Sequence, residues 1–178
     1  MLNTAEQKTI LVYARELLKA RLTDGPEPEL KLSREVMEQK CGIFVTLKHQ
    51  GRLRGCIGHI LGDESLRKSI HTMTLAAAFE DPRFPPLALN ELKDLKIHIS
   101  LLTKPVSVKS YKDIRTGTDG IIVSRGWKKG VYLPEVATET RWDAKTFFQS
   151  CALEKAGLME QELPDATIEV FQTEGFGD

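Results

Sequence analysis

The segment Leu53–Gly58 places the thiol of Cys56 between two glycines, Gly55 and Gly58, in a stretch with the alternation of a β-strand. Glycine weakens a strand and lets another backbone or a ligand approach closely. In a regular strand Arg54 faces the same side as Cys56, where its guanidinium would favour the thiolate over the thiol. The segment therefore indicates either a reactive cysteine, with Cys56 as nucleophile, or a small packing residue beside a bulge.

A nucleophilic cysteine also needs a base, and His59 is the histidine nearest to Cys56 in the sequence. Three residues along a strand put His59 on the opposite face from Cys56 unless Gly58 bends the chain. A metal site built on these two residues lacks the second pair of ligands that characterises zinc motifs. We expect no metal and no cofactor.

A second cluster of reactive side chains lies in the segment Phe79–Pro86, which contains three prolines, two acids and Arg83. The prolines restrict the backbone, so Asp81 and Arg83 are expected to point in fixed directions. Two interpretations remain open. Asp81 and Arg83 form the rim of a binding site, or they hold a structural corner at the end of a helix.

A third cluster, Leu133–Asp143, leaves a strand and enters a helix, and it offers Glu135 and Glu139 as carboxylates. Trp142 could stack on a ligand, or it could pack against the helix that follows. The sequence contains no phosphate-binding loop of the Walker type and no G-x-G-x-x-G string, so the usual nucleotide-binding signatures are absent.

Several secondary-structure elements must position these clusters. Hydrophobic periodicity predicts helices over residues 4–22, 33–40, 65–79 and 144–156, and strands over residues 43–47, 53–57, 95–101, 120–123, 131–133 and 167–173. The strands are joined by hairpins more often than by helices. We therefore predict an α+β fold with a mostly antiparallel sheet flanked by helices.

Composition limits the class of protein. The chain has 178 residues, with 25 basic side chains balanced by 25 acidic ones, which disfavours a protein held mainly to nucleic acid. No apolar run is long enough for a membrane span, and the three cysteines form no C-x-x-C pair, as is typical of a reducing compartment. We expect a single-domain cytoplasmic protein without a membrane anchor.

At the three clusters the sequence resembles the AMMECR family, whose microbial members are called AmmeMemoRadiSam system protein A. The resemblance rests on four segments that occur in the family's order: Leu53–Gly58, Ala77–Pro86, Leu133–Ala137 with Trp142 and Asp143, and Lys155–Leu158. It extends from about Leu11 to Phe171. It implies an α+β fold of two subdomains with a cleft between them and a functional site near Cys56.

The leading hypothesis is that a small molecule, or a modified group on a larger substrate, binds in that cleft. Cys56 is the candidate nucleophile and Arg54 the group that stabilises its thiolate, while Gly55, Gly58, Asp81, Arg83 and Glu135 contact the ligand. The alternative is a non-catalytic adaptor that docks a Memo-type protein or a radical S-adenosylmethionine protein, because the family name associates it with both. Glu135 stands where many family members have glutamine, which adds a negative charge there.

Overall fold

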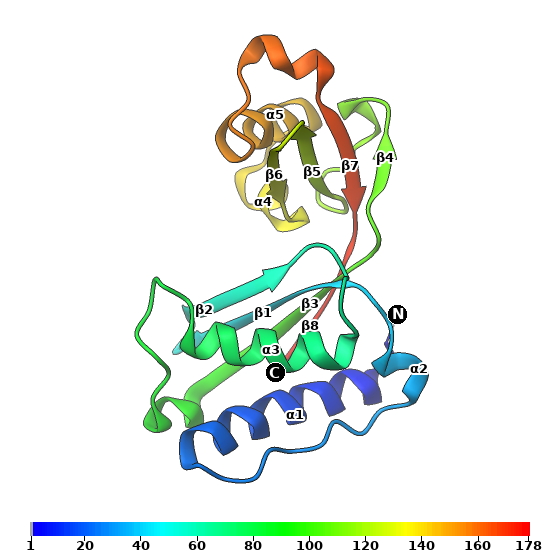
Figure 1. The fold of residues 1–178 in the computed structure, drawn as a ribbon. Coiled ribbons are helices and arrows are strands. Elements are labelled where there is room, and N and C mark those ends of the chain that lie inside the picture. The colour runs from blue at the N-terminus through cyan, green and yellow to red at the C-terminus, as the bar shows by residue number, and fades with distance from the viewer. Residues whose placement is uncertain (1) are drawn as a thin grey trace. The chain divides into compact units, whose positions relative to one another are not determined.

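The structure, a computed structural model, describes residues 2–178, which form two compact units. Unit 1 extends to Leu102 and includes the C-terminal segment Glu174–Asp178, whereas unit 2 is Thr103–Thr173. Each unit has a four-stranded antiparallel sheet (Figure 1). Each unit also has a hydrophobic core of its own. The α+β fold class is confirmed. Within residues 2–178, no helix combines the length and the hydropathy that a membrane span requires.

Unit 1 contains three helices and a sheet with the strand order β2-β1-β3-β8, called sheet 1. The helices are α1 (Thr4–Thr23), α2 (Arg34–Met37) and α3 (Leu66–Phe79), and the strands are β1 (Gly42–His49), β2 (Arg52–His59), β3 (Leu95–Leu102) and β8 (Thr173–Gly177). A 3-10 helix, Leu89–Asp94, leads into β3. The predicted helices and strands of this part of the chain are confirmed, although the second helix is shorter than predicted.

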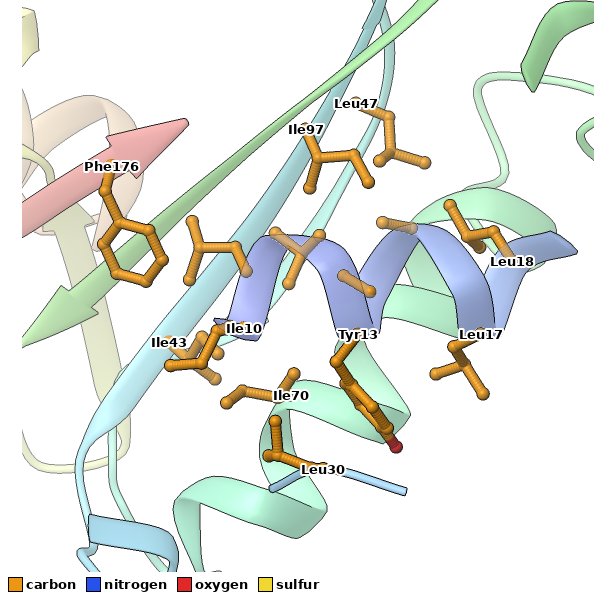
Figure 2. Close-up of a cluster of buried hydrophobic side chains, with 14 of the residues drawn as sticks. Ile10, Tyr13, Leu17, Leu18, Leu30, Ile43, Leu47, Ile70, Ile97 and Phe176 are labelled. Carbon is orange, nitrogen blue, oxygen red and sulfur yellow. The ribbon is translucent and has the colours of Figure 1, made fainter. Parts of the chain in front are cut away.

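One face of sheet 1 carries the core of unit 1. Alternate strand residues, including Leu47 and Ile97, are fully buried against α1 and α3 (Figure 2). On α1 the buried side chains recur at helical spacing and include Ile10 and Leu17, so the sequence periodicity describes this packing correctly. Burial of apolar surface is the main force that holds the helices on this face.

The intervening strand residues point to the opposite face, called here the far face of sheet 1. In β1 and β3 they include Thr46, Lys48, Lys96 and His98, none of which is fully buried. In β2 the residue on this face is Cys56, which lies opposite Thr46 in the β1–β2 register. The far face therefore carries the polar and ionisable side chains of the sheet.

Unit 2 has the strand order β4-β7-β5-β6. Its strands are β4 (Val106–Val108), β5 (Gly120–Arg125), β6 (Lys128–Tyr132) and β7 (Thr167–Phe171), and its helices are α4 (Pro134–Thr140) and α5 (Ala144–Ser150). Asp143 caps α5, its carboxylate accepting a hydrogen bond from the Thr146 amide at 2.8 Å. One turn of π-helix, Cys151–Lys155, continues α5 before Gly157, which has a φ of +67°.

Two strands and one α-helix were not predicted. Strand β4 has three residues, too few for a clear alternation. Helix α4 lies in a segment for which we predicted neither a helix nor a strand, and Pro134 at its first turn starts a helix of seven residues. Strand β8 contains Gly175 and Gly177, which hide its strand pattern. Pairing with neighbouring strands and packing on the core stabilise these elements, and neither interaction leaves a periodic pattern in the sequence.

Candidate functional site around Cys56

Cys56 lies on β2, which is an edge strand of sheet 1. Its Sγ is 3.2 Å from the Thr46 Oγ1 on β1, and the two residues are directly opposite in the register. The thiol is half-buried. The main-chain groups of Cys56 bond outward to the 81–83 segment, so Thr46 and Cys56 form a pair of the type that lacks direct ladder hydrogen bonds and brings side chains closer together.

Asp81 and Arg83 hold the backbone of Cys56 at this edge. The Cys56 amide donates to Asp81 Oδ2 at 2.8 Å, and an Arg83 guanidinium nitrogen donates to the Cys56 carbonyl oxygen at 3.3 Å. Arg83 also donates to Asp81 through its Nε at 2.9 Å and through Nη2 at 2.7 Å. The two side chains thus occupy the donor and the acceptor that an exposed strand edge would otherwise leave free.

We call Asp81 and Arg83, bound to the backbone of Cys56, the latch, and its electrostatics follow from its geometry. Asp81 is 4% exposed, and its hydrogen bonds from Arg83, together with those from the Cys56 and Arg83 amides, hold the pKa of its carboxyl far below the ordinary range. Asp81 raises the pKa of Arg83 in turn, and charge on Cys56 adds a smaller contribution in the same direction. The Arg83 side chain is 54% exposed, so its guanidinium faces both Cys56 and solvent.

Arg54 binds Glu91 and the carbonyl oxygen of Pro86. Its Nε donates to Glu91 Oε1 at 2.6 Å and its Nη2 to Glu91 Oε2 at 2.9 Å, with a further bond to the Pro86 carbonyl oxygen at 3.2 Å. The bidentate ion pair raises the pKa of Arg54, because the hydrogen bond to Glu91 stabilises the charged guanidinium. Arg54 therefore ties the proline-rich loop to β2, and its action on the Cys56 thiolate stays a prediction.

The alternation predicted for β2 is interrupted. The β1–β2 register shifts between Leu47 and Lys48, so Gly55 lies opposite Leu47 and Leu53 lies opposite Lys48. Directly opposite residues share a face, which places Leu53 on the far face, away from Gly55. Leu53 is 42% exposed accordingly. The alternation expected of this strand therefore fails at Leu53, because the bulge at Arg54 cannot be seen in the period of two.

The two glycines have close backbone neighbours inside unit 1. A Cβ at Gly55 would lie 1.9 Å from the Ala77 carbonyl oxygen of α3, and a Cβ at Gly58 would lie 2.1 Å from the Ile43 carbonyl oxygen. Gly55 thus lets α3 pack directly on the edge strand behind Cys56. Contact of either glycine with a ligand stays a prediction.

The histidines do not bring a base to Cys56 from its own strand. His59 lies opposite Ile43, on the core side of sheet 1, as the strand period predicted. One of its ring nitrogens bonds to the Leu61 carbonyl oxygen at 2.6 Å and the other to the Ser69 hydroxyl at 3.2 Å. Among residues 2–178, no three histidine, cysteine or acidic side chains group closely enough to hold a metal ion together.

Glu135 belongs to unit 2, at the start of α4. It lines a cavity of about 470 Å³ together with seven other residues of that unit: Gly117, Thr118, Pro134, Thr138, Glu139, Gln172 and Thr173. Its place in one ligand site with Cys56 stays a prediction, as does the cleft that the family resemblance implies. A larger cavity of about 600 Å³ lies in unit 1 beside the Tyr13–His71 hydrogen bond.

Sequence reasoning missed Thr46, whose hydroxyl is the nearest polar partner of the thiol. The strand alternation of residues 43–47 could have placed it on the far face, but the register that sets it opposite Cys56 is a property of the hairpin. It also missed Glu91, which lies 37 residues from its partner Arg54. No local signal in the sequence connects these two.

Comparisons with known proteins agree with the fold and with the family resemblance. The AMMECR1 family model matches residues 11–176. A protein of Methanothermobacter thermautotrophicus is 38% identical over 178 residues, covering 96% of this chain and 92% of that protein, and one of Methanosarcina barkeri is 36% identical, covering 94% and 85%. The crystal structure of an uncharacterised protein from Pyrococcus horikoshii has a TM-score of 0.86 at 30% identity, covering 99% of this chain and 93% of that one. The chain belongs to the AMMECR1 family.

Proposed function

We propose that this protein binds a small molecule, or a modified group on a larger substrate, over the far face of sheet 1, and that the Cys56 thiol is its reactive group. The observation that carries the proposal is the latch at the strand edge. Asp81 fixes the Arg83 guanidinium against the backbone of Cys56, and more than half of the Arg83 side chain remains exposed. The thiol of Cys56 is half-buried and lies 3.2 Å from the Thr46 hydroxyl, so its sulfur remains partly open to a reagent.

The other two cysteines provide a contrast within the same chain. Cys151 is fully buried in the core of unit 2, and burial raises the pKa of its thiol to about 12. Burial also raises the pKa of Cys41. Cys56, by contrast, is half-buried, and its carbonyl oxygen accepts from the Arg83 guanidinium that Asp81 holds, which supports the choice of Cys56 as the reactive thiol.

Alkylation tests the proposal. At pH 7 and with limiting iodoacetamide, we expect Cys56 to be modified about tenfold faster than the free thiol of glutathione, because the thiolate is the reacting form. Cys41 and Cys151 in the same sample should react much more slowly. Peptide mapping by mass spectrometry measures the three rates together. A Cys56 rate no higher than that of glutathione, in folded protein, would remove the nucleophile from the proposal.

Two variants separate charge from structure. Arg83→Lys keeps a cation beside Cys56 and should retain most of the rate, whereas Arg83→Gln should lower it several-fold. Circular dichroism on both variants shows whether the fold is kept. Equal rates in the two variants would mean that Arg83 holds the backbone of Cys56 but that its charge does not affect the reaction. Docking of a Memo-type or radical S-adenosylmethionine protein stays a prediction.

A further inference from the structure

A pair of lysines stands out on the far face of sheet 1. Lys48 on β1 and Lys96 on β3 are directly opposite each other in the register, and both side chains are exposed. Like charges in this position repel each other and destabilise a sheet. Within residues 2–178, neither lysine forms an ion pair or a side-chain hydrogen bond, although charge on Lys96 makes a small contribution to lowering the pKa of Asp178.

The row next to these lysines contains the thiol. Cys56 lies opposite Thr46 in one register, and Thr46 lies opposite His98 in the other, so the three residues form one line across β2, β1 and β3. The two rows are two residues apart along the strands, which corresponds to about 7 Å. The lysine pair therefore lies within the length of a small metabolite from the thiol.

Glycines on β8 place the ring of His98. A Cβ at Gly175 would lie 3.0 Å from its Nε2, and a Cβ at Gly177 would lie 2.9 Å from its Nδ1. The absence of side chains at these two positions gives the exposed ring its space over β8. His98 thus extends the line from Cys56 toward the far edge of the sheet.

The far face holds no carboxylate to balance the lysines. The residues of the four strands that the register and the core assign to it are Gly42, Phe44, Thr46, Lys48, Leu53, Cys56, Gly58, Lys96, His98, Ser100, Leu102, Gly175 and Gly177. None is aspartate or glutamate. Asp178, just past β8, is held by Arg15 of α1 and by the Ile97 amide. A local positive field therefore persists in a chain whose formal net charge is zero.

We infer that the substrate of this site carries an anionic group, a phosphate or a carboxylate, that binds between Lys48 and Lys96 while its reacting part lies at Cys56 and Thr46. The anion would remove the repulsion between the two ammonium groups and supply the partner that each lacks. The inference rests on the proposed function, and it adds the chemical class of the ligand and the residues that recognise it.

Two alkylating agents of similar size test the inference. Iodoacetate is an anion and iodoacetamide is neutral, and each reacts with a thiolate by displacing iodide and forming a carbon–sulfur bond. We expect the iodoacetate-to-iodoacetamide rate ratio at Cys56 to exceed the ratio for glutathione by about threefold to tenfold at low salt. The excess should shrink as the ionic strength rises, because salt screens exposed charges.

Lysine variants locate the effect. The double variant Lys48→Gln, Lys96→Gln should bring the ratio close to that of glutathione. The ratio is the readout because both reagents react with the same thiol, so a general change in its reactivity cancels. The control variant Lys8→Gln, Lys40→Gln has the same change in net charge at exposed positions outside the far face and should keep the ratio. An equal drop in both double variants, or no drop in either, would overturn the lysine site.

A second measurement does not depend on the reactivity of Cys56. In Cys56→Ser protein, titration with inorganic phosphate or acetate followed by amide NMR should shift the Lys48 and Lys96 signals to saturation, and the lysine double variant should lose the shift. The stronger of the two anions indicates the ligand chemistry. No saturable shift with either anion would overturn the inference, whereas slow iodoacetamide labelling with intact anion binding would overturn only the proposed function.

Discussion

Replacing Gly55 with alanine should destabilise the protein by about 3 kcal/mol, the upper part of the range for overpacking a tight interior. The added Cβ would lie 1.9 Å from the Ala77 carbonyl oxygen, which is a backbone atom in the last turn of α3. Backbone in a packed helix cannot rotate away as a side chain can. Either α3 or the edge strand must move, and the latch on Cys56 moves with it. Urea unfolding followed by circular dichroism measures the loss.

Gly25→Ala is the matched control for this experiment. Its added Cβ would lie 3.3 Å from the Thr23 hydroxyl, which can turn aside, so the change in unfolding free energy should stay below about 1 kcal/mol. An urea midpoint for Gly55→Ala equal to that of the unaltered protein would show that α3 does not pack against β2 as described. In the Gly55→Ala protein, iodoacetamide should also no longer modify Cys56 faster than Cys41 and Cys151.

Replacing Asp81 with asparagine should cost about 2 to 3 kcal/mol, because the change leaves hydrogen-bond donors without their charged acceptor. The carboxylate accepts from the Cys56 amide, from the Arg83 amide and twice from the Arg83 guanidinium. Exposure of Arg83 to solvent weakens the purely ionic part of this interaction. Asp143→Asn makes the same chemical change at a helix cap, where asparagine works as well as aspartate, and should have little effect.

Asp81 should also make the free energy of unfolding depend on pH in the acid range. The folded protein holds the pKa of Asp81 below its unfolded value of about 3.9, so its contribution is complete above that pH and is lost as the pH falls toward the folded pKa. Unfolding free energy should therefore decline below about pH 4, and the decline should be shallower in Asp81→Asn. Glu91 and Asp119, whose pKa values are also lowered, account for part of what remains. Parallel curves for the two proteins between pH 4 and pH 2, set by the ordinary aspartate pKa, would contradict this role for Asp81.

Local pattern was sufficient where the side chains of one element decide its structure. The apolar residues of α1 repeat at helical spacing because a single face is buried. The Asn3–Glu6 capping box fixes the N-terminal end of this helix. Residues 43–57 predicted a hairpin because each strand buries one face. The resemblance to the AMMECR family also lay in the sequence, and the match over residues 11–176 confirms it.

Tertiary structure decided the chemistry around the thiol. Sequence pattern singled out Cys56, Asp81 and Arg83 separately, but only the fold brings the 81–83 segment to the edge of β2. Only the fold shows that Arg54 pairs with Glu91 and with the Pro86 carbonyl oxygen of the proline-rich loop, while its action on the thiol stays a prediction. Such pairings depend on strand register and loop path, which are set by the whole core.

The amino-acid sequence by itself determined the α+β class, the family and the residues capable of chemistry, because these depend on residue type and on spacing within one element. The tertiary structure decided that Thr46 is the neighbour of Cys56 and that Lys48 faces Lys96. Register across separate strands makes those pairs, since a shift of one residue would turn every side chain to the other face.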